Sequence, residues 1–169
     1  GIGDLFDVTV MPVTGDVTYA RGTGDDPSSG LWSYADRTKE VARPGYYSVP
    51  LTRYGITAEM TATSRVGLHR YTFPASNAAA LVFDLENGGC SDKATETHIE
   101  ALDDHTVCGW RYSEGWARDQ RVWFVAESSK PFAAFERIDG DRYGRASFST
   151  TEGEQVLLKV ALSPVRLGL

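Results

Sequence analysis

An alternating stretch between residues 44 and 74 is the sequence feature that most constrains the fold. In its middle, three apolar side chains alternate with polar or β-branched ones: Ile56, Ala58 and Met60. This two-residue period is typical of an antiparallel strand with one buried face. A second alternating run starts at Val66, and the Tyr54-Gly55 break before the first predicts a hairpin. Three such strands in succession form the meander from which a β-sandwich is built.

Short strands separated by turn residues are predicted along the rest of the chain. They cover residues 5–13, ended by Pro12, and then 78–86, 95–102, 106–112, 122–126, 132–138, 146–150 and 155–165. Turns are predicted at three polar or glycine-rich sites: Asn87-Gly88-Gly89, Asp103-Asp104 and Asp139-Gly140-Asp141. Residues 14–30 are expected to form a loop, and residues 36–42 a short helical turn. The pattern predicts a single all-β domain, an antiparallel β-sandwich.

Charge and composition exclude several kinds of partner. The net charge of −6 argues against nucleic acid, because a phosphate backbone binds basic surfaces. No apolar run approaches the ~20 residues that a membrane-spanning helix needs. The only cysteines are Cys90 and Cys108, and both a disulfide and a pair of buried free thiols remain open. Their spacing does not indicate a zinc site.

Adjacent carboxylates are the first candidates for catalysis, since glycoside hydrolysis needs two facing carboxyl groups. Asp25-Asp26 and Asp103-Asp104 lie in turns, where such side chains mostly accept backbone N–H groups. Asp4, which is close to Asp7, follows Gly1-Ile2-Gly3 at a loop-to-strand junction. There a carboxylate can reach outward, although a structural hydrogen bond is the favoured interpretation.

Histidines offer a weaker signal. His98 and Glu100 share a strand face and His105 follows a turn, so a metal site is the alternative to solvated side chains. His69 lies in a core-forming strand, and we interpret it as a core or interface histidine, with a catalytic base second.

Tryptophans are candidates for stacking on sugar rings. Trp110 and Trp116 flank a loop, so one of them is expected to be exposed, whereas Trp123 is predicted to lie in the core. Packing in the core or at its rim is the favoured role for all of them.

Several motifs, in order along nearly the whole chain, resemble the N-terminal domain of glycoside hydrolase family 92, the exo-acting α-mannosidases. The motifs lie at residues 1–12, 44–49, 54–63, 65–74, 109–116, 122–124, 129–132 and 159–163. The resemblance implies a supersandwich-like β-sandwich packed on a larger (α/α)6 barrel, with the active site at the junction. It further implies calcium-dependent, inverting hydrolysis of mannose-containing glycans, with the catalytic carboxylates and the calcium site on the barrel.

Residues 1–169 are therefore expected to be an N-terminal β-sandwich domain, truncated at both ends and inactive alone, with no catalytic or metal-binding residue of its own. Its partners are expected to be the barrel of the same polypeptide and mannose-containing glycans, in a secreted, periplasmic or cell-envelope enzyme. Substrate contact is assigned to a loop that the resemblance places at the interdomain cleft: Gly1, Ile2, Gly3 and Asp4. The alternatives are a stand-alone carbohydrate-binding module, which uses Trp110 or Trp116, and a purely structural sandwich.

Overall fold

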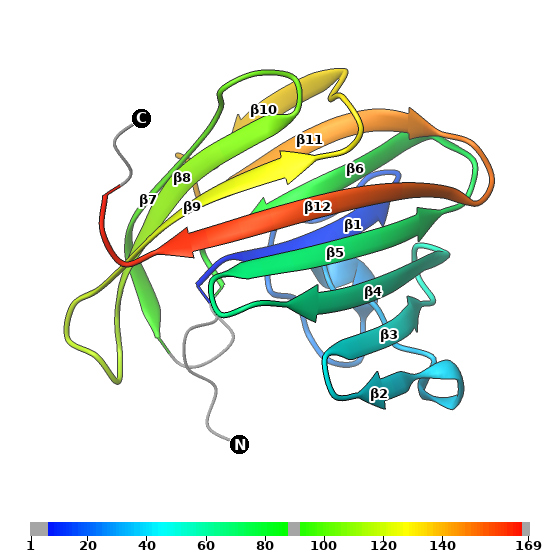
Figure 1. The fold of residues 1–169 in the computed structure, drawn as a ribbon, viewed down its shortest axis with the longest axis horizontal. Helices are drawn as coiled ribbons and strands as arrows, with labels where there is room; N and C mark the ends of the chain where they lie inside the picture. Colours follow the sequence, from blue (N-terminus) through cyan, green and yellow to red (C-terminus); the bar gives the residue numbers. More distant parts are fainter. Residues whose placement is uncertain (1–6, 88–91, 167–169) are drawn as a thin grey trace.

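Segments that alternate between apolar and polar side chains form strands in the computed structural model, which describes residues 7–87 and 92–166. The strands run antiparallel in two sheets (Figure 1), with the order β1-β6-β11-β10 in the smaller and β2-β3-β4-β5-β12-β9-β8-β7 in the larger. The bounds are β1 Thr9–Thr14, β2 Val41–Arg43, β3 Tyr46–Leu51, β4 Ile56–Ala62, β5 Val66–Phe73, β6 Ser76–Asp84, β7 Lys93–Ala101, β8 Thr106–Glu114, β9 Gln120–Ser128, β10 Ala134–Ile138, β11 Tyr143–Thr150 and β12 Glu154–Ser163. The predicted antiparallel β-sandwich is confirmed.

The predicted meander forms the β3-β4-β5 part of the larger sheet. Ala58 lies opposite Val49 on one side and Tyr71 on the other, and all three side chains are buried on the inner face. Gly55 ends the turn before β4 with a φ of 65°, a left-handed conformation that glycine adopts without strain. The local pattern therefore predicts both the strands and their pairing here.

The core lies between the sheets and centres on β6. Its residues from Ala79 to Phe83 are fully buried on both faces of the smaller sheet. On the inner face, the Phe83 ring stacks at 6.2 Å from the Phe124 ring of the larger sheet. Burial of apolar surface of this kind is the main force that stabilises a sandwich.

The predicted loop after β1 covers the outer face of the smaller sheet. Its Tyr19 ring lies 5.5 Å from the ring of Tyr143 on β11, and Arg145 Nη2 donates to the Gly15 carbonyl oxygen at 3.1 Å. A 3-10 helix, η1 (Pro27–Ser29), lies within this loop; a second, η2 (Arg37–Lys39), falls where a helical turn was predicted.

Two local predictions are wrong. Strand β1 does not end at Pro12 but continues to Thr14, with Pro12 opposite Leu81. Proline is tolerated there because β1 is an edge strand, whose outward side needs no N–H donor. Trp123 is not in the core: it is half-buried on the outer face of the larger sheet, against the ring of Tyr112 at 5.5 Å.

Gly109 permits close packing of β7, β8 and β9, and replacing it tests the fold. An added Cβ meets the His98 carbonyl oxygen and lies 2.9 Å from Phe124 Cε1. We expect Gly109→Ala to lower the free energy of unfolding by about 3 kcal/mol in urea denaturation, through overpacking. Gly24→Ala is the control, because no atom lies within 4 Å of its added Cβ, and a change within about 0.5 kcal/mol is expected. Equal stability of the two variants would contradict this account of the packing.

Candidate functional site

The residues predicted to contact substrate, Gly1, Ile2, Gly3 and Asp4, lie outside the described residues. The described chain begins at Asp7, whose side chain is 3% exposed. A buried carboxylate is costly unless it is paired and hydrogen-bonded, so its partners decide how this part of the chain is held.

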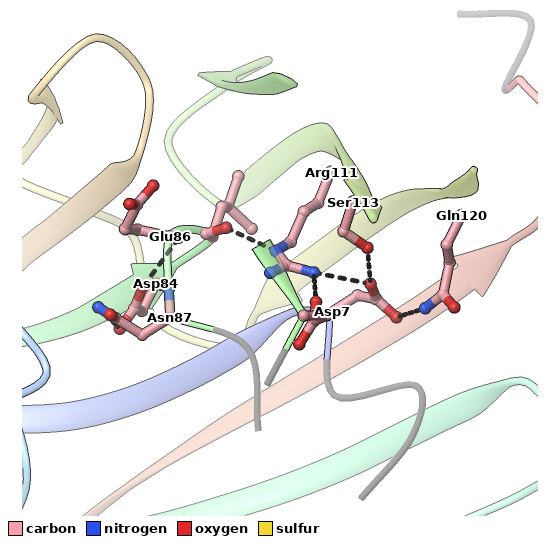
Figure 2. Close-up of polar contacts among 9 residues, drawn as sticks. Asp7, Asp84, Glu86, Asn87, Arg111, Ser113 and Gln120 are labelled. Carbon is pink, nitrogen blue, oxygen red and sulfur yellow. Dashed lines mark hydrogen bonds and ion pairs between the residues drawn. The ribbon is translucent and has the colours of Figure 1, made fainter. Parts of the chain in front are cut away.

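Three side chains of the larger sheet hold the Asp7 carboxylate (Figure 2). Arg111 Nη1 donates to Asp7 Oδ1 at 3.0 Å, and Ser113 Oγ donates to the same oxygen at 3.4 Å. Gln120 Nε2 donates to Asp7 Oδ2 at 2.6 Å. Asp7 is therefore tied to β8 and, through Gln120, to the first residue of β9.

Arg111 is the centre of this cluster and is fully buried. Its Nε donates to the Leu85 carbonyl oxygen at 2.6 Å, and its Nη1 also pairs with Asp92 Oδ2 at 2.5 Å. Its Nη2 has no hydrogen-bond partner in the described part of the chain. One guanidinium thus joins three segments: Asp7 before β1, Leu85 directly after β6, and Asp92 directly before β7.

The arrangement holds the chain in place rather than performing acid–base chemistry. Two carboxylates, Asp7 and Asp92, share one buried cation, and charge-assisted hydrogen bonds of this kind hold the side chains in a defined orientation. Asp7 lies three residues after Asp4 in the sequence, so the cluster anchors the first described residue after the predicted substrate loop.

A second polar group lies beside it at the end of β6 (Figure 2). Asp84 Oδ1 accepts hydrogen bonds from the backbone N–H groups of Glu86 at 3.0 Å and Asn87 at 2.9 Å. Burial raises the pKa of Asp84, and these amide donors oppose the rise. Asn87 also donates to the Tyr143 hydroxyl at 3.0 Å, which fixes the start of the predicted Asn87-Gly88-Gly89 turn; its two glycines lie outside the described residues.

In each pair of adjacent carboxylates that was predicted to cap a turn, one carboxylate does so. Asp26 accepts from the backbone N–H and the hydroxyl of Ser28, and these hydrogen bonds lower its pKa. Asp103 accepts from the backbone N–H groups of His105 and Thr106, and these bonds lower its pKa in the same way. Neither carboxylate is available as a catalytic group.

The histidines have separate partners. His98 Nδ1 lies 2.9 Å from Asp141 Oδ2, whereas His105 Nδ1 contacts the Ser128 carbonyl oxygen at 2.8 Å. Among residues 7–87 and 92–166, no group of three or more His, Cys, Asp or Glu side chains is placed to hold a metal ion. His69 is half-buried with Nδ1 2.6 Å from the Tyr71 hydroxyl, and burial lowers its pKa.

Of the two tryptophans predicted to flank a loop, Trp116 lies in the β8–β9 loop and is 86% exposed, as expected for one of them, whereas Trp110 lies within β8. Trp110 is half-buried: its ring stacks on His98 at 4.3 Å, and its Nε1 donates to Glu96 at 3.1 Å. Trp116 alone of this pair presents an open ring. The described cysteine, Cys108, carries a buried free thiol whose pKa is raised by burial; Cys90 lies outside the described residues.

The buried ion pair between Arg111 and Asp7 was not predicted from the sequence. A signal for Arg111 was available, because it shares the inward-facing positions of β8 with Val107, Gly109 and Ser113. A charged residue at a core-facing position predicts a buried partner. Asp7 could not be identified as that partner from local patterns, since the two residues are 104 positions apart.

Two solved structures that contain this sandwich are glycoside hydrolases, which defines the class: a β-sandwich domain of a glycoside hydrolase. The family GH92 α-mannosidase BT3965 from Bacteroides thetaiotaomicron, solved with mannoimidazole, matches with a TM-score of 0.89 and 31% identity over 98% of this chain. The GH92 family glycosyl hydrolase ccman5 matches with a TM-score of 0.72 and 28% identity over 94%. The inverting mannosidase BT2199, at 21% identity and a TM-score of 0.71, shows the shared fold.

The sequence profile of the glycosyl hydrolase family 92 N-terminal domain matches residues 1–163, and the chain belongs to this family. The resemblance found from the sequence is thereby confirmed. The chain spans 24% of the length of BT3965 and of ccman5. No curated protein sequence matches it. In the part of the chain that the structure describes, no helix is long and apolar enough to cross a membrane.

Removing the Asp7 carboxylate tests the role of the buried cluster. We expect Asp7→Ala to lower the free energy of unfolding by about 3 kcal/mol in urea, because Arg111 loses one of its two carboxylates inside the core. Asp119→Ala is the matched control, since its ion pair with Arg121 is exposed to solvent and contributes little to stability. A change as small for Asp7→Ala as for Asp119→Ala would show that the cluster does not hold the chain.

Proposed function

We propose that this domain forms one wall of the interdomain active site of an exo-α-mannosidase. Its family membership and its similarity to the mannosidase BT3965 support this assignment. The substrates would be glycans that end in α-linked mannose, and the enzyme would work in a secreted, periplasmic or cell-envelope location.

The observation that carries the proposal is the buried ion pair between Arg111 and Asp7. The proposed substrate contacts, Gly1, Ile2, Gly3 and Asp4, directly precede the segment that this pair holds. A sugar site needs contacts held within a fraction of an ångström, and a buried guanidinium bound on several sides gives such rigidity. Glycine in this loop would let the backbone approach a sugar ring closely.

The chemistry would be inverting hydrolysis, with both reacting carboxyl groups on the helical domain of the longer polypeptide. One carboxylic acid would protonate the leaving oxygen, while a carboxylate roughly 6.5–9.5 Å away would activate water on the opposite face of the sugar. Calcium is likewise proposed for that helical domain, where it would orient sugar hydroxyl groups. This chain would position the sugar and exclude water from one side.

Turnover measurements test whether the catalytic groups belong to the helical domain rather than to this chain. We expect the purified 169-residue chain to release no aryl alcohol from an aryl α-mannoside, because both reacting carboxyl groups are proposed for the helical domain. A longer polypeptide that continues into a helical domain should hydrolyse the same substrate. Proton NMR should show β-mannose as the first product, and a calcium chelator should abolish the activity. Turnover by the short chain, or α-mannose as the first product, would contradict the proposal.

A stand-alone carbohydrate-binding module is the second candidate, and the exposed Trp116 favours it. An open indole can stack on a sugar ring. Titration of the chain with mannose, followed by tryptophan fluorescence, separates the two functions. The active-site wall predicts no saturable change, since half of the pocket is elsewhere. The module predicts saturable quenching that Trp116→Ala removes and that Trp32→Ala, away from the β8–β9 loop, retains.

A further inference from the structure

Two shallow hollows lie next to each other on the outer face of the larger sheet, along the β4–β5 hairpin, with volumes of ≈ 200 and ≈ 240 Å³. Thr61 and Leu68 line both, so they form one continuous surface. We call it the hairpin patch and define it by its outward-facing apolar side chains: Tyr46, Val66, Leu68 and Leu157. These come from strands β3, β5 and β12 of the larger sheet (Figure 1).

Apolar side chains at outward positions are the first sign of a contact surface. Leu68 and Leu157 are 37% and 40% exposed on the outer face of the larger sheet, where the alternation would place polar residues. They lie on the adjacent strands β5 and β12. A contiguous exposed apolar patch of this kind marks an interaction site more often than chance.

A rigid polar frame holds the middle of the patch. Arg70 donates two hydrogen bonds to Glu59, at 2.7 and 2.6 Å, and the Tyr46 hydroxyl donates a third at 2.6 Å. The Arg70 bonds, followed by the Tyr46 bond, lower the pKa of Glu59 to about 2. The carboxylate is therefore satisfied within the chain, and the Tyr46 ring is fixed in one orientation.

The rim of the patch is basic, although the chain as a whole carries a net charge of −6. The Arg43 guanidinium lies 4.6 Å from the centre of the Tyr46 ring, and Lys159, which pairs with Glu127 at 3.4 Å, lines one hollow. Arg65 lies in the turn at the hairpin tip. Within the described residues, Arg43 and Arg65 take part in no ion pair. A partner surface with complementary charge would present carboxylates.

We propose that the hairpin patch docks onto the helical domain of the longer family 92 polypeptide, against apolar side chains ringed by carboxylates. The inference rests on the proposed function and names the surface through which that partner is bound. Residues beyond this domain make up about three quarters of a family 92 mannosidase, because the chain spans 24% of BT3965. A second copy of this chain fits less well, since two basic rims would face each other.

The test uses the longer polypeptide with Leu68→Asp and Leu157→Asp combined. In the isolated chain both positions are partly exposed beside basic residues, so we expect the midpoint of thermal unfolding to stay within about 2 °C. In the longer polypeptide, calorimetry should show an unfolding midpoint lower by roughly 5 °C or a split into two transitions. Leu102→Asp is the matched control: Leu102 is 47% exposed but lies in the β7–β8 turn, outside the patch.

Each outcome separates this inference from the proposed function. If the double variant unfolds like Leu102→Asp in an active longer polypeptide, the patch is not the docking surface and the mannosidase assignment stands. If the unaltered longer polypeptide hydrolyses no mannoside, the proposed function fails, whereas the calorimetric comparison still decides whether the patch docks. Self-association of the isolated chain in sedimentation, lost in the double variant, would assign the patch to a second copy and overturn the inference.

Discussion

A buried guanidinium is the interaction on which the arrangement at one end of the sandwich depends. Arg111 occupies a core-facing position of β8, so its charge must be matched inside the protein. Asp7 and Asp92 supply the match, and the Leu85 carbonyl oxygen accepts a further hydrogen bond. Because these partners precede β1, follow β6 and precede β7, one side chain determines how three segments approach each other. The same contact links the fold to the function that we propose.

Strands and turns could be predicted because they depend on neighbours in sequence. The alternation through Ile56 and Ala58 determines which face of β4 is buried, whatever the rest of the chain does. Asp26 and Asp103 cap turns through bonds to residues two or three positions away. Such features are encoded within a few residues, and the structure agrees with them.

Features that depend on sheet order could not be read in the same way. Local rules predict that a strand ends at Pro12, but an edge strand tolerates proline. Strand β1 is an edge strand because it pairs with β6 and with no other strand of the described sheet. Trp123 has an apolar ring that suits a core. Side chains alternate between the two faces along β9, however, so Phe124 and Ala126 point inward and Trp123 points outward. The ion pair of Asp7 with Arg111 joins residues 104 positions apart. Local periodicity contains no information on such contacts.

The pairing order of the smaller sheet has a consequence for synthesis on the ribosome. Strand β6 lies between β1, which precedes it in the sequence, and β11, which ends at Thr150. Its fully apolar residues from Ala79 to Phe83 therefore emerge long before their second neighbour exists. Until β11 has been translated, this segment lacks one of its two neighbours, and unpaired apolar strands of this kind are prone to pair with other polypeptides during folding.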